Sequence, residues 1–504
     1  MSLIVETTKG KIEGFQKDGM DIWLGIPHSK PPVGDLRFKH AQPMDAWEGV
    51  KACRQFGNKP IQFPFMQFGK PIETVSESED CLYLNIWKPA DGKKLPVFVW
   101  IYGGANHIGE GSDPSYDGEY MAKQGILYVN FNYRVGPLGF YDFSIYDDSF
   151  DANCGVSDQL AGLKWIKENI EAFGGDPDNI TIAGESAGGT AVYDMLACPA
   201  AKGLFRKAIA QSGLSGSCGT KNAQKLNLEL FLDQMHLSPQ EVAKLKEMPA
   251  DEMKAAATWL VLNNCAVYPS LYCLGPEIGD DLLPQYPWDA MASGSAAGVD
   301  VIFGSNHDEG TLFVQKKNTM FPNSWAQTET MLRLNAKEAF LPRLKQLYGN
   351  LPNEREAMCA IARDRAFWAD HIRCADAQST HGNVWVYRYD FSAGLLKLLK
   401  FGAMHGSEIP FALGNMTGGI SILHKLTGRK KLKNMTAQLN TAWVNFAKYG
   451  DPNGSGIEWE PYDAHKRATH IFSLNPITEY NPNAEALALW NEIGQLYAEP
   501  ISEI

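Results

Sequence analysis

A serine lies between two glycines in the stretch GESAG (184–188), directly after a short apolar run. This G-x-S-x-G pattern is typical of a sharp strand-to-helix turn that exposes the serine oxygen as a nucleophile. Glycines on both sides let neighbouring backbones approach without Cβ clashes. A serine that only caps the next helix is the alternative. Because strand, turn and helix follow in the order that the motif requires, we interpret Ser186 as a nucleophile.

A serine hydroxyl is a weak nucleophile and needs a base. In sites of this kind the acid and then the histidine follow the serine along the chain. His405 lies far downstream in GAMHGSEIPF (402–411), a loop whose glycines can present an imidazole, although a surface histidine is the alternative. Asp308 and Glu309 both fit the acid by position, at the end of a predicted strand, and both could instead be solvated carboxylates.

The third requirement is a set of backbone N–H groups that face the oxygen on which negative charge develops. Losing one such donor costs about 3 to 4 kcal/mol of transition-state stabilisation. The N–H of Ala187, the residue after the serine, is one candidate donor. A glycine-rich loop after an early strand should supply the others, and WIYGGANHIGEG (100–111) has that composition. A turn that only permits close packing is the alternative.

These residues must be positioned by alternating strands and helices. Apolar runs predict buried strands at 95–102, 125–134, 179–185 and 385–391, and 298–310 predicts another that ends in a polar loop. Helical periodicity predicts helices over 156–173 and after Ser186, and an amphipathic helix followed by a turn within 436–453. This alternation favours a single α/β domain over 1–504 with a large, mostly parallel sheet. Helix-rich stretches at about 220–300 and 315–400 are expected to be insertions that cap the site.

Composition narrows the class of partner. The chain has 504 residues, 44% of them hydrophobic, and a net charge of −12, which disfavours nucleic acids and anionic membrane surfaces. No apolar run of about 18 residues predicts a membrane span, and no signal peptide is visible. Nine cysteines without a CxxC pair suggest neither a zinc site nor a disulfide framework. We expect a cytoplasmic protein with reduced thiols, and monomer and homodimer both stay open.

Together the motifs resemble the type-B carboxylesterase and cholinesterase-like family of α/β-hydrolases, most closely its bacterial nitrobenzyl-esterase-like members. The resemblance spans nearly the whole chain. It is carried by LGIPHSKPPVGDLRF (24–38), EDCLYLNIWKP (79–89), VWIYGGAN (99–106), NYRVGPLGF (132–140), ENIEAFGGDPDNITIAGESAGG (168–189), GSNHDEG (304–310) and HGSEIPF (405–411).

The resemblance implies a role for each candidate residue. It implies that Ser186 is the nucleophile, His405 the general base and Glu309, rather than Asp308, the acid. It further implies oxyanion donors at Gly104, Ala105 and Ala187, residues Glu185 and Ser212 beside the triad, and a structural ion pair between Arg134 and Asp176. No metal or organic cofactor is implied.

Three departures from the family pattern affect specificity. The usual three-glycine run reads Gly103-Gly104-Ala105, which keeps every N–H but adds a methyl group beside the scissile carbonyl. The cysteine pairs of extracellular members are incomplete, which supports a reduced protein. The loop at 61–78 is short and lacks the tryptophan of choline-binding members, so we do not expect choline esters. Its Phe63, Phe65, Met66 and Phe68 either line a pocket or pack the loop onto the body.

The sequence therefore predicts a serine carboxylesterase that hydrolyses small-molecule esters of short to medium acids through a covalent acyl-enzyme. Amide, carbamate or lactone hydrolysis by the same triad is an alternative. A non-catalytic binding or scaffold protein on this fold is another, although such relatives typically lack the serine.

Overall fold

The computed structural model describes residues 3–64, 75–273, 275–315, 320–418, 420–424, 426–454 and 456–497. These residues form a sheet of 13 strands in the order β1-β2-β3-β5-β7-β6-β8-β9-β10-β11-β12-β13, with β4 paired to β2. The strands are β1 (Leu3–Glu6), β2 (Lys11–Lys17), β3 (Met20–Pro27), β4 (Val50–Ala52), β5 (Tyr83–Pro89), β6 (Leu95–Ile101), β7 (Leu127–Phe131), β8 (Gly175–Glu185), β9 (Lys207–Gln211), β10 (Asp300–Asn306), β11 (Val384–Tyr389), β12 (Ala468–Phe472) and β13 (Ile477–Tyr480).

The central strands run parallel. Every neighbouring pair from β7 through β6, β8, β9, β10 and β11 to β12 is parallel. The pairs from β1 to β7 in the strand order given above, and the pair of β12 and β13, are antiparallel. The carboxyl ends of the parallel strands therefore meet at one edge of the sheet, the edge at which open α/β sheets bind ligands. The predicted large, mostly parallel sheet is confirmed.

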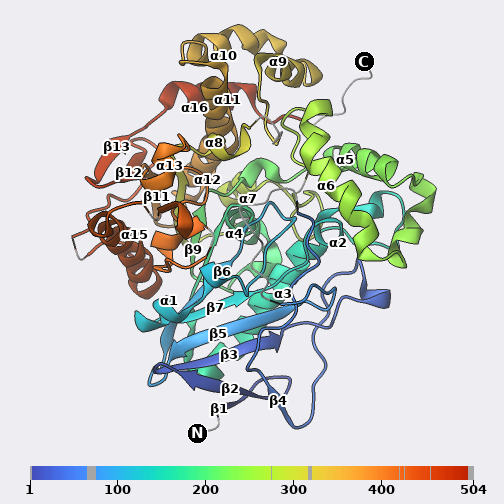
Figure 1. Ribbon diagram of the computed structural model, residues 1–504, viewed down its shortest axis with the longest axis vertical. Coiled ribbons are helices and arrows are strands. Elements are labelled where there is room, and N and C mark those ends of the chain that lie inside the picture. The colour runs from blue at the N-terminus through green and yellow to red at the C-terminus, as the bar shows by residue number, and fades with distance from the viewer. Residues whose placement is uncertain are drawn as a thin grey trace.

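Helices cover both faces of the sheet and extend beyond it. Figure 1 shows α9, α10 and α16 at the end of the molecule opposite β1, β2 and β4. The α-helices are α1 (Glu119–Lys123), α2 (Pro137–Phe140), α3 (Cys154–Asn169), α4 (Ala187–Ala197), α5 (Lys221–Gln234), α6 (Ala250–Val267), α7 (Pro287–Ala292), α8 (Gly310–Phe313), α9 (Trp325–Leu334), α10 (Leu341–Tyr348), α11 (Glu354–Ala362), α12 (Asp370–Gln378), α13 (Gly394–Leu398), α14 (Ile409–Ala412), α15 (Arg429–Tyr449) and α16 (Ala484–Ile493).

Strand β6 explains why the central runs are apolar at every position. Successive side chains of a strand point to opposite faces of its sheet. Val97, Val99 and Ile101 join the core that contains residues of α3 and α4. Phe98 and Trp100 join the core on the other face, which contains residues of α15. Both faces are thus buried, and no position of the strand needs a polar side chain.

The ends of several elements differ from the prediction. Strand β8 begins at Gly175, four residues before the expected start at 179. The helix expected over 156–173 ends at Asn169 and continues as a short 3-10 turn through Phe173. The strand expected over 125–134 is limited to Leu127–Phe131.

The helix-rich stretches lie between strands of the central sheet. Helices α5, α6 and α7 fall between β9 and β10, and α9 to α12 fall between β10 and β11. Figure 1 shows α5 and α6 side by side at one flank of the sheet. Phe231 of α5 and Leu260 of α6 share a separate apolar core with Phe143. This first helical unit therefore packs against residues of the N-terminal part of the chain, in a core separate from the two beside the sheet.

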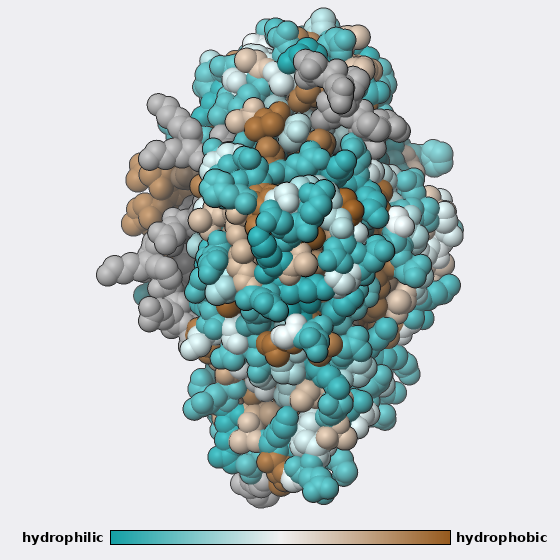
Figure 2. All heavy atoms as spheres, turned by 90° about the vertical axis from the view of Figure 1, so that its right-hand side faces the viewer, coloured by the Kyte–Doolittle hydropathy of each residue, from teal (hydrophilic) through white to brown (hydrophobic). Residues whose placement is uncertain are grey.

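The surface in Figure 2 is mostly hydrophilic, with hydrophobic residues scattered between polar ones. Over the described ranges, no helix is both long enough and apolar enough to cross a membrane.

The ion pair of Arg134 is not the expected one. Its guanidinium binds Asp158 of α3 through two hydrogen bonds, Nε to Oδ2 at 2.8 Å and Nη2 to Oδ1 at 2.7 Å. Both side chains are buried. Asp176 instead lies 3.9 Å from the exposed Nζ of Lys94. The predicted pairing of Arg134 with Asp176 is therefore wrong, because α3 brings a carboxylate to the buried guanidinium and Asp176 stays near the surface.

We expect Asp158→Ala to destabilise the protein by about 3 to 5 kcal/mol, because it leaves a buried guanidinium without its carboxylate. Asp176→Ala is the matched control and should change the free energy of unfolding by less than about 1 kcal/mol. Urea unfolding monitored by fluorescence measures both variants. Equal losses would contradict the assignment of Asp158 as the partner.

Candidate active site

Ser186 forms the turn between β8 and α4. Its φ of 59° and ψ of −124° lie in a region that residues with a side chain rarely adopt. A Cβ on Gly184 would lie 2.3 Å from the oxygen of Gly188, and a Cβ on Gly188 would lie 2.0 Å from the oxygen of Ile101. Glycine is required at both positions because the backbones touch there. The turn has the geometry that the motif predicts.

The backbone of Ser186 is held in place, but its hydroxyl does not cap the helix. Ser186 occupies the N-cap position of α4, and its side chain makes no capping hydrogen bond. Its N–H donates to the oxygen of Gln211 at 2.9 Å, and its own oxygen accepts from the N–H of Thr190 at 2.8 Å. The alternative of a purely capping serine is thus excluded, and the hydroxyl stays available for chemistry.

The glycine-rich loop after β6 packs directly against this turn. A Cβ on Gly103 would lie 2.5 Å from the oxygen of Glu185 and 2.9 Å from the Cβ of Ser186. Gly104 and Ala105 follow with φ values of 123° and 54°. The loop can come this close because Gly103 has no side chain.

Three backbone N–H groups near the turn at Ser186 are candidate donors to an oxyanion. Within the described ranges, the N–H groups of Gly104, Ala105 and Ala187 donate no hydrogen bond to the protein. Ala187 is the first residue of α4, where an N–H has no partner inside the helix. These are the three donors that the sequence analysis selected. Together with the helix N-terminus they favour negative charge at this point.

His405 and Glu309 form a buried pair. The Nδ1 atom of His405 lies 2.6 Å from Oε2 of Glu309, whose side chain is fully buried. The backbone N–H of Asn306 donates to the other carboxylate oxygen at 2.7 Å. A carboxylate can only accept, so Nδ1 carries the proton and Nε2 is the basic nitrogen. The rings of Phe313 and Phe367 pack on the imidazole at centroid distances of 4.9 and 5.3 Å.

Asp308, the other acid that the sequence allowed, points elsewhere. It accepts from the backbone N–H of Ala403 at 2.8 Å and contacts Nδ1 of His307 at 2.9 Å. Glu309 is therefore the one of these two adjacent carboxylates that meets His405.

Three glutamates act on the imidazole of His405. Burial lowers the pKa of His405, but the negative charges of Glu185, Glu309 and Glu408 outweigh it and raise the pKa to about 9. Nε2 of His405 lies 3.3 Å from Oε1 of Glu185. Burial also raises the pKa of Glu185, to about 8, against the attraction of the imidazolium. Because Glu185 and His405 lie this close together, they titrate as a coupled pair.

A polar network that the sequence motifs did not predict lies behind this site. Oε1 of Glu408 accepts from Nε2 of Gln211 at 3.1 Å, and Oε2 accepts from Nδ2 of Asn306 at 2.5 Å. Glu408 is fully buried. Gln211 and Asn306 end the apolar strands β9 and β10, and Glu408 follows His405 by three residues. A polar residue at the carboxyl end of an apolar strand was the available signal.

Glu185 directly precedes Ser186, and Ser212 follows the strand beside β8. Glu185 pairs in register with Gln211, the residue before Ser212, in the ladder of β8 and β9. Ser212 is fully buried, and its N–H donates to the oxygen of Gly304 at 2.7 Å.

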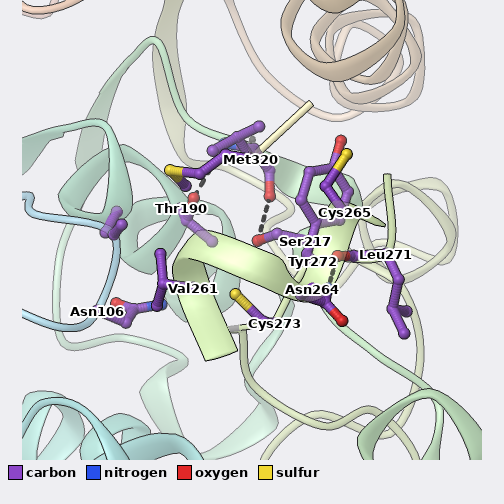
Figure 3. A pocket seen from close by; sticks show the side chains of 13 residues that line it. Asn106, Thr190, Ser217, Val261, Asn264, Cys265, Leu271, Tyr272, Cys273 and Met320 are labelled. Carbon is purple, nitrogen blue, oxygen red and sulfur yellow. Dashed lines mark hydrogen bonds between the residues drawn. The ribbon is translucent and has the colours of Figure 1, made fainter. Parts of the chain in front are cut away.

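A pocket opens between the two sets of N–H donors and helix α6. Ala105 and Ala187 line one side, and Val261, Asn264 and Cys265 of α6 line another. Figure 3 shows this lining, with Thr190 and Ser217 among the polar side chains. The cavity volume is about 40 Å³, a few times the roughly 10–15 Å³ that one water needs.

Phe63 does not line this pocket. It is fully buried, its N–H donates to the oxygen of His107 at 2.9 Å, and its ring contacts Gly136. Phe63 therefore packs its loop onto the body of the protein, which was one of the two roles that the sequence allowed. Phe65, Met66 and Phe68 lie outside the described residues.

The described part of the chain contains no group of three or more histidine, cysteine, aspartate or glutamate side chains placed to hold a metal ion. The chemistry that the geometry supports is nucleophilic attack by a serine with a histidine base and a backbone site for an oxyanion.

Comparison with known proteins identifies relatives along the whole chain. The model of the carboxylesterase family matches residues 1–490. Para-nitrobenzyl esterase of Bacillus subtilis is 36% identical over 484 residues, which cover 96% of this chain and 97% of that protein. Fumonisin B1 esterase of Sphingopyxis macrogoltabida is 32% identical and covers 92% of this chain and 85% of that protein.

Solved structures agree with the sequence relatives. A structure of PNB esterase superposes with a TM-score of 0.87 and 35% identity, and covers 97% of this chain and 99% of its own. A thermophilic PNB esterase superposes with a TM-score of 0.86 and 34% identity over the same shares.

We expect Gly188→Ala to cost about 3 kcal/mol of stability, the upper end of the range for overpacking, because its Cβ meets rigid backbone. Gly428→Ala is the control, since a Cβ there meets nothing within 4 Å and Gly428 has no positive φ. It should change the free energy of unfolding by less than about 0.5 kcal/mol. Urea unfolding of the two variants tests this, and a neutral Gly188→Ala would contradict the close approach.

Proposed function

This chain belongs to the carboxylesterase family and is a carboxylic-ester hydrolase, and we propose that Ser186, His405 and Glu309 perform the hydrolysis. The resemblance inferred from the motifs is thereby confirmed at the level of the family. The observation that carries the residue assignment is the 2.6 Å hydrogen bond between His405 and Glu309. This hydrogen bond leaves Nε2 of His405 free to act as the base for Ser186, whose hydroxyl does not cap helix α4.

In the first half of the reaction, the Oγ of Ser186 attacks the ester carbonyl carbon while Nε2 of His405 takes its proton. Glu309 holds Nδ1–H, which fixes the tautomer and stabilises the imidazolium that forms. The carbonyl oxygen becomes an oxyanion and accepts from the N–H groups of Gly104, Ala105 and Ala187. Because these N–H groups have no acceptor among the described residues, no hydrogen bond there must break as the charge develops.

The tetrahedral intermediate then collapses and the alcohol leaves with the proton of His405, which ends the first half of the reaction. A water molecule then gives a proton to the same nitrogen and attacks the acyl carbon. The acid departs and Ser186 recovers its proton. The acyl part therefore stays bound through both halves, whereas the alcohol must leave after the first.

The substrates that fit best are esters of short to medium acids. The cavity of about 40 Å³ beside Ala105 and Ala187 supports a small acyl group. A relative over nearly the full length is a para-nitrobenzyl esterase, which supports esters of small aromatic alcohols as substrates. We also propose that the helical insertions at about 220–300 and 315–400 cap the site, because α6 supplies Val261 and Cys265 to the pocket wall.

We place the protein in a reducing compartment such as the cytoplasm. All nine cysteines have free thiols, and eight of them are buried. Proteins of oxidising compartments commonly use such residues in disulfides.

We expect Ser186→Ala to lower kcat for 4-nitrophenyl esters by a factor on the order of 10⁴ or more. Nitrophenol release from acetyl, butanoyl, hexanoyl and octanoyl esters measures the effect, and the optimum should fall at the shorter chains. Ser157→Ala, which removes a buried serine of α3 outside the pocket lining, is the control for folding. Equal rates for Ser186→Ala and the unmodified protein would refute the assignment.

We expect Glu185→Gln to move the acid limb of kcat/KM to lower pH by about one unit or more. His405 must be neutral to act as a base, so activity rises with pH through its pKa, and the negative charge of Glu185 raises that pKa. Glutamine removes the charge and keeps the shape.

A pH–rate profile with a 4-nitrophenyl ester measures this shift. Glu277→Gln is the matched control, because burial also raises the pKa of Glu277 to about 8 and it does not act on His405. An unchanged limb in Glu185→Gln would show that this carboxylate does not control the base.

A further inference from the structure

One π-helical segment, η9 (Arg363–Ala369), joins the site to a second hollow. It lies between α11 and α12, and π-helical turns are frequent at functional sites. The ring of Phe367 packs on the imidazole of His405 at a centroid distance of 5.3 Å. Two residues earlier, the guanidinium carbon of Arg365 lies 5.3 Å from the ring centroid of Tyr272.

Tyr272 lines both the pocket beside Ala187 and a smaller hollow, which we call the Arg365 subsite. Ser217, Leu271 and Tyr272 line both spaces, so the two are adjacent. Arg365 lines only the second. The subsite has a volume of about 20 Å³, which is room for one or two waters. A carboxylate is of that size.

Arg365 lacks an anionic partner. Within the described residues, its guanidinium donates to the oxygen of Ser270 at 3.1 Å and to the hydroxyl of Tyr272 at 3.4 Å, and no carboxylate lies within 4.0 Å. Two of its five N–H groups are thereby used. A half-buried guanidinium is most stable when an anion meets it, and carboxylates suit its planar fork.

The neighbouring arginines have their own acids. Arg363 pairs with Asp364 at 2.7 Å, and Arg373 pairs with Asp370 at 2.9 Å. Asp370 also accepts from the backbone N–H of Gly216. Asp370, which interacts with Arg365, is therefore already bound to Arg373 and Gly216, and no described acid forms an ion pair with Arg365.

The N-terminus of α5 faces the same hollow. Thr220, the N-cap of this 14-residue helix, and Ala223 of its first turn both line the Arg365 subsite. A helix N-terminus favours negative charge. A guanidinium and a helix N-terminus thus converge on a space of the size of one carboxylate.

We propose that the Arg365 subsite binds a carboxylate at the far end of the substrate's acyl chain, so that half-esters of dicarboxylic acids are preferred substrates. This inference rests on the proposed function. We assign this carboxylate to the acyl part of the substrate and not to the alcohol. Ser217, Leu271 and Cys273, which line the pocket that leads toward Arg365, are buried, and the acyl group stays bound throughout the reaction. The leaving alcohol needs an open path instead.

The test compares monomethyl succinate, glutarate and adipate with methyl butanoate, pentanoate and hexanoate, with acid release followed in a pH-stat. Arg365→Gln should lower kcat/KM for the half-ester that the protein prefers by a factor of about 10 to 100, the range of a charged hydrogen bond. The neutral esters should change by less than about twofold. Arg365→Lys keeps the charge and should retain part of the preference.

Arg355→Gln is the matched control. Arg355 also donates to backbone oxygens, those of Thr311 and Val314, and it does not line the subsite. It should leave the ratio of half-ester to neutral ester unchanged. An equal loss on both substrate types in Arg365→Gln would mean that Arg365 only holds the loop at Ser270, and would overturn the proposal.

Two further arms separate this proposal from the esterase assignment. The butanoyl ester of glycolic acid carries its carboxylate on the alcohol part, and its hydrolysis should not depend on Arg365. Calorimetric binding of the preferred half-ester to Ser186→Ala should weaken about 10-fold or more when Arg365→Gln is added. If neutral esters are hydrolysed but Arg365→Gln does not weaken binding of the half-ester, only the subsite is overturned. If no ester of either kind is hydrolysed, the proposed function is overturned.

Discussion

The close approach of β6 and β8 at their carboxyl ends is the constraint on which the site depends. Ile101 and Gly184 are partners in the ladder, and just beyond them the glycine-rich loop and the turn at Ser186 touch. Gly103 and Gly188 lack the side chains that would hold the backbones apart. The N–H groups of the loop and of α4 can therefore reach one small volume. A fixed set of backbone dipoles can stabilise an oxyanion there without a charged side chain.

The charges of the site are buried behind that contact. A carboxylate removed from water is stable only with hydrogen-bond donors or a cation. Glu309 has His405 and the N–H of Asn306, and Glu408 has Gln211 and the amide of Asn306. Trp443 of α15 donates to the oxygen of the Gln211 side chain at 2.8 Å. The network thus runs through the sheet to the helix on its far side, which holds the imidazole in one orientation.

The sheet edge and the helical insertions have different roles. The strands supply the serine turn and the acid, and the loop after β11 supplies the histidine. Helix α6 and the loop around Tyr272 line the pocket that we propose for the acyl chain. Segment η9 connects the two, because it packs Phe367 on His405 and Arg365 on Tyr272. Changes in the insertions can therefore alter specificity and leave the sheet edge intact.

The sequence by itself determined the local parts of this protein. The apolar runs identified the central strands, and the glycines at 184 and 188 identified the turn at Ser186, because strand, turn and helix are contiguous in the chain. From the residues alone Asp308 and Glu309 stayed equivalent. The resemblance selected Glu309, and the tertiary structure brings it to His405.

Only the tertiary structure decided the long-range pairings. Arg134 had carboxylates available at Asp158 and Asp176, and the packing of α3 brought Asp158 to it. Glu408 and Arg365 carried no signal of their own in the sequence. Their roles depend on which buried groups surround them after folding, and the burial and distance that set those charges are properties of segments far apart in the chain.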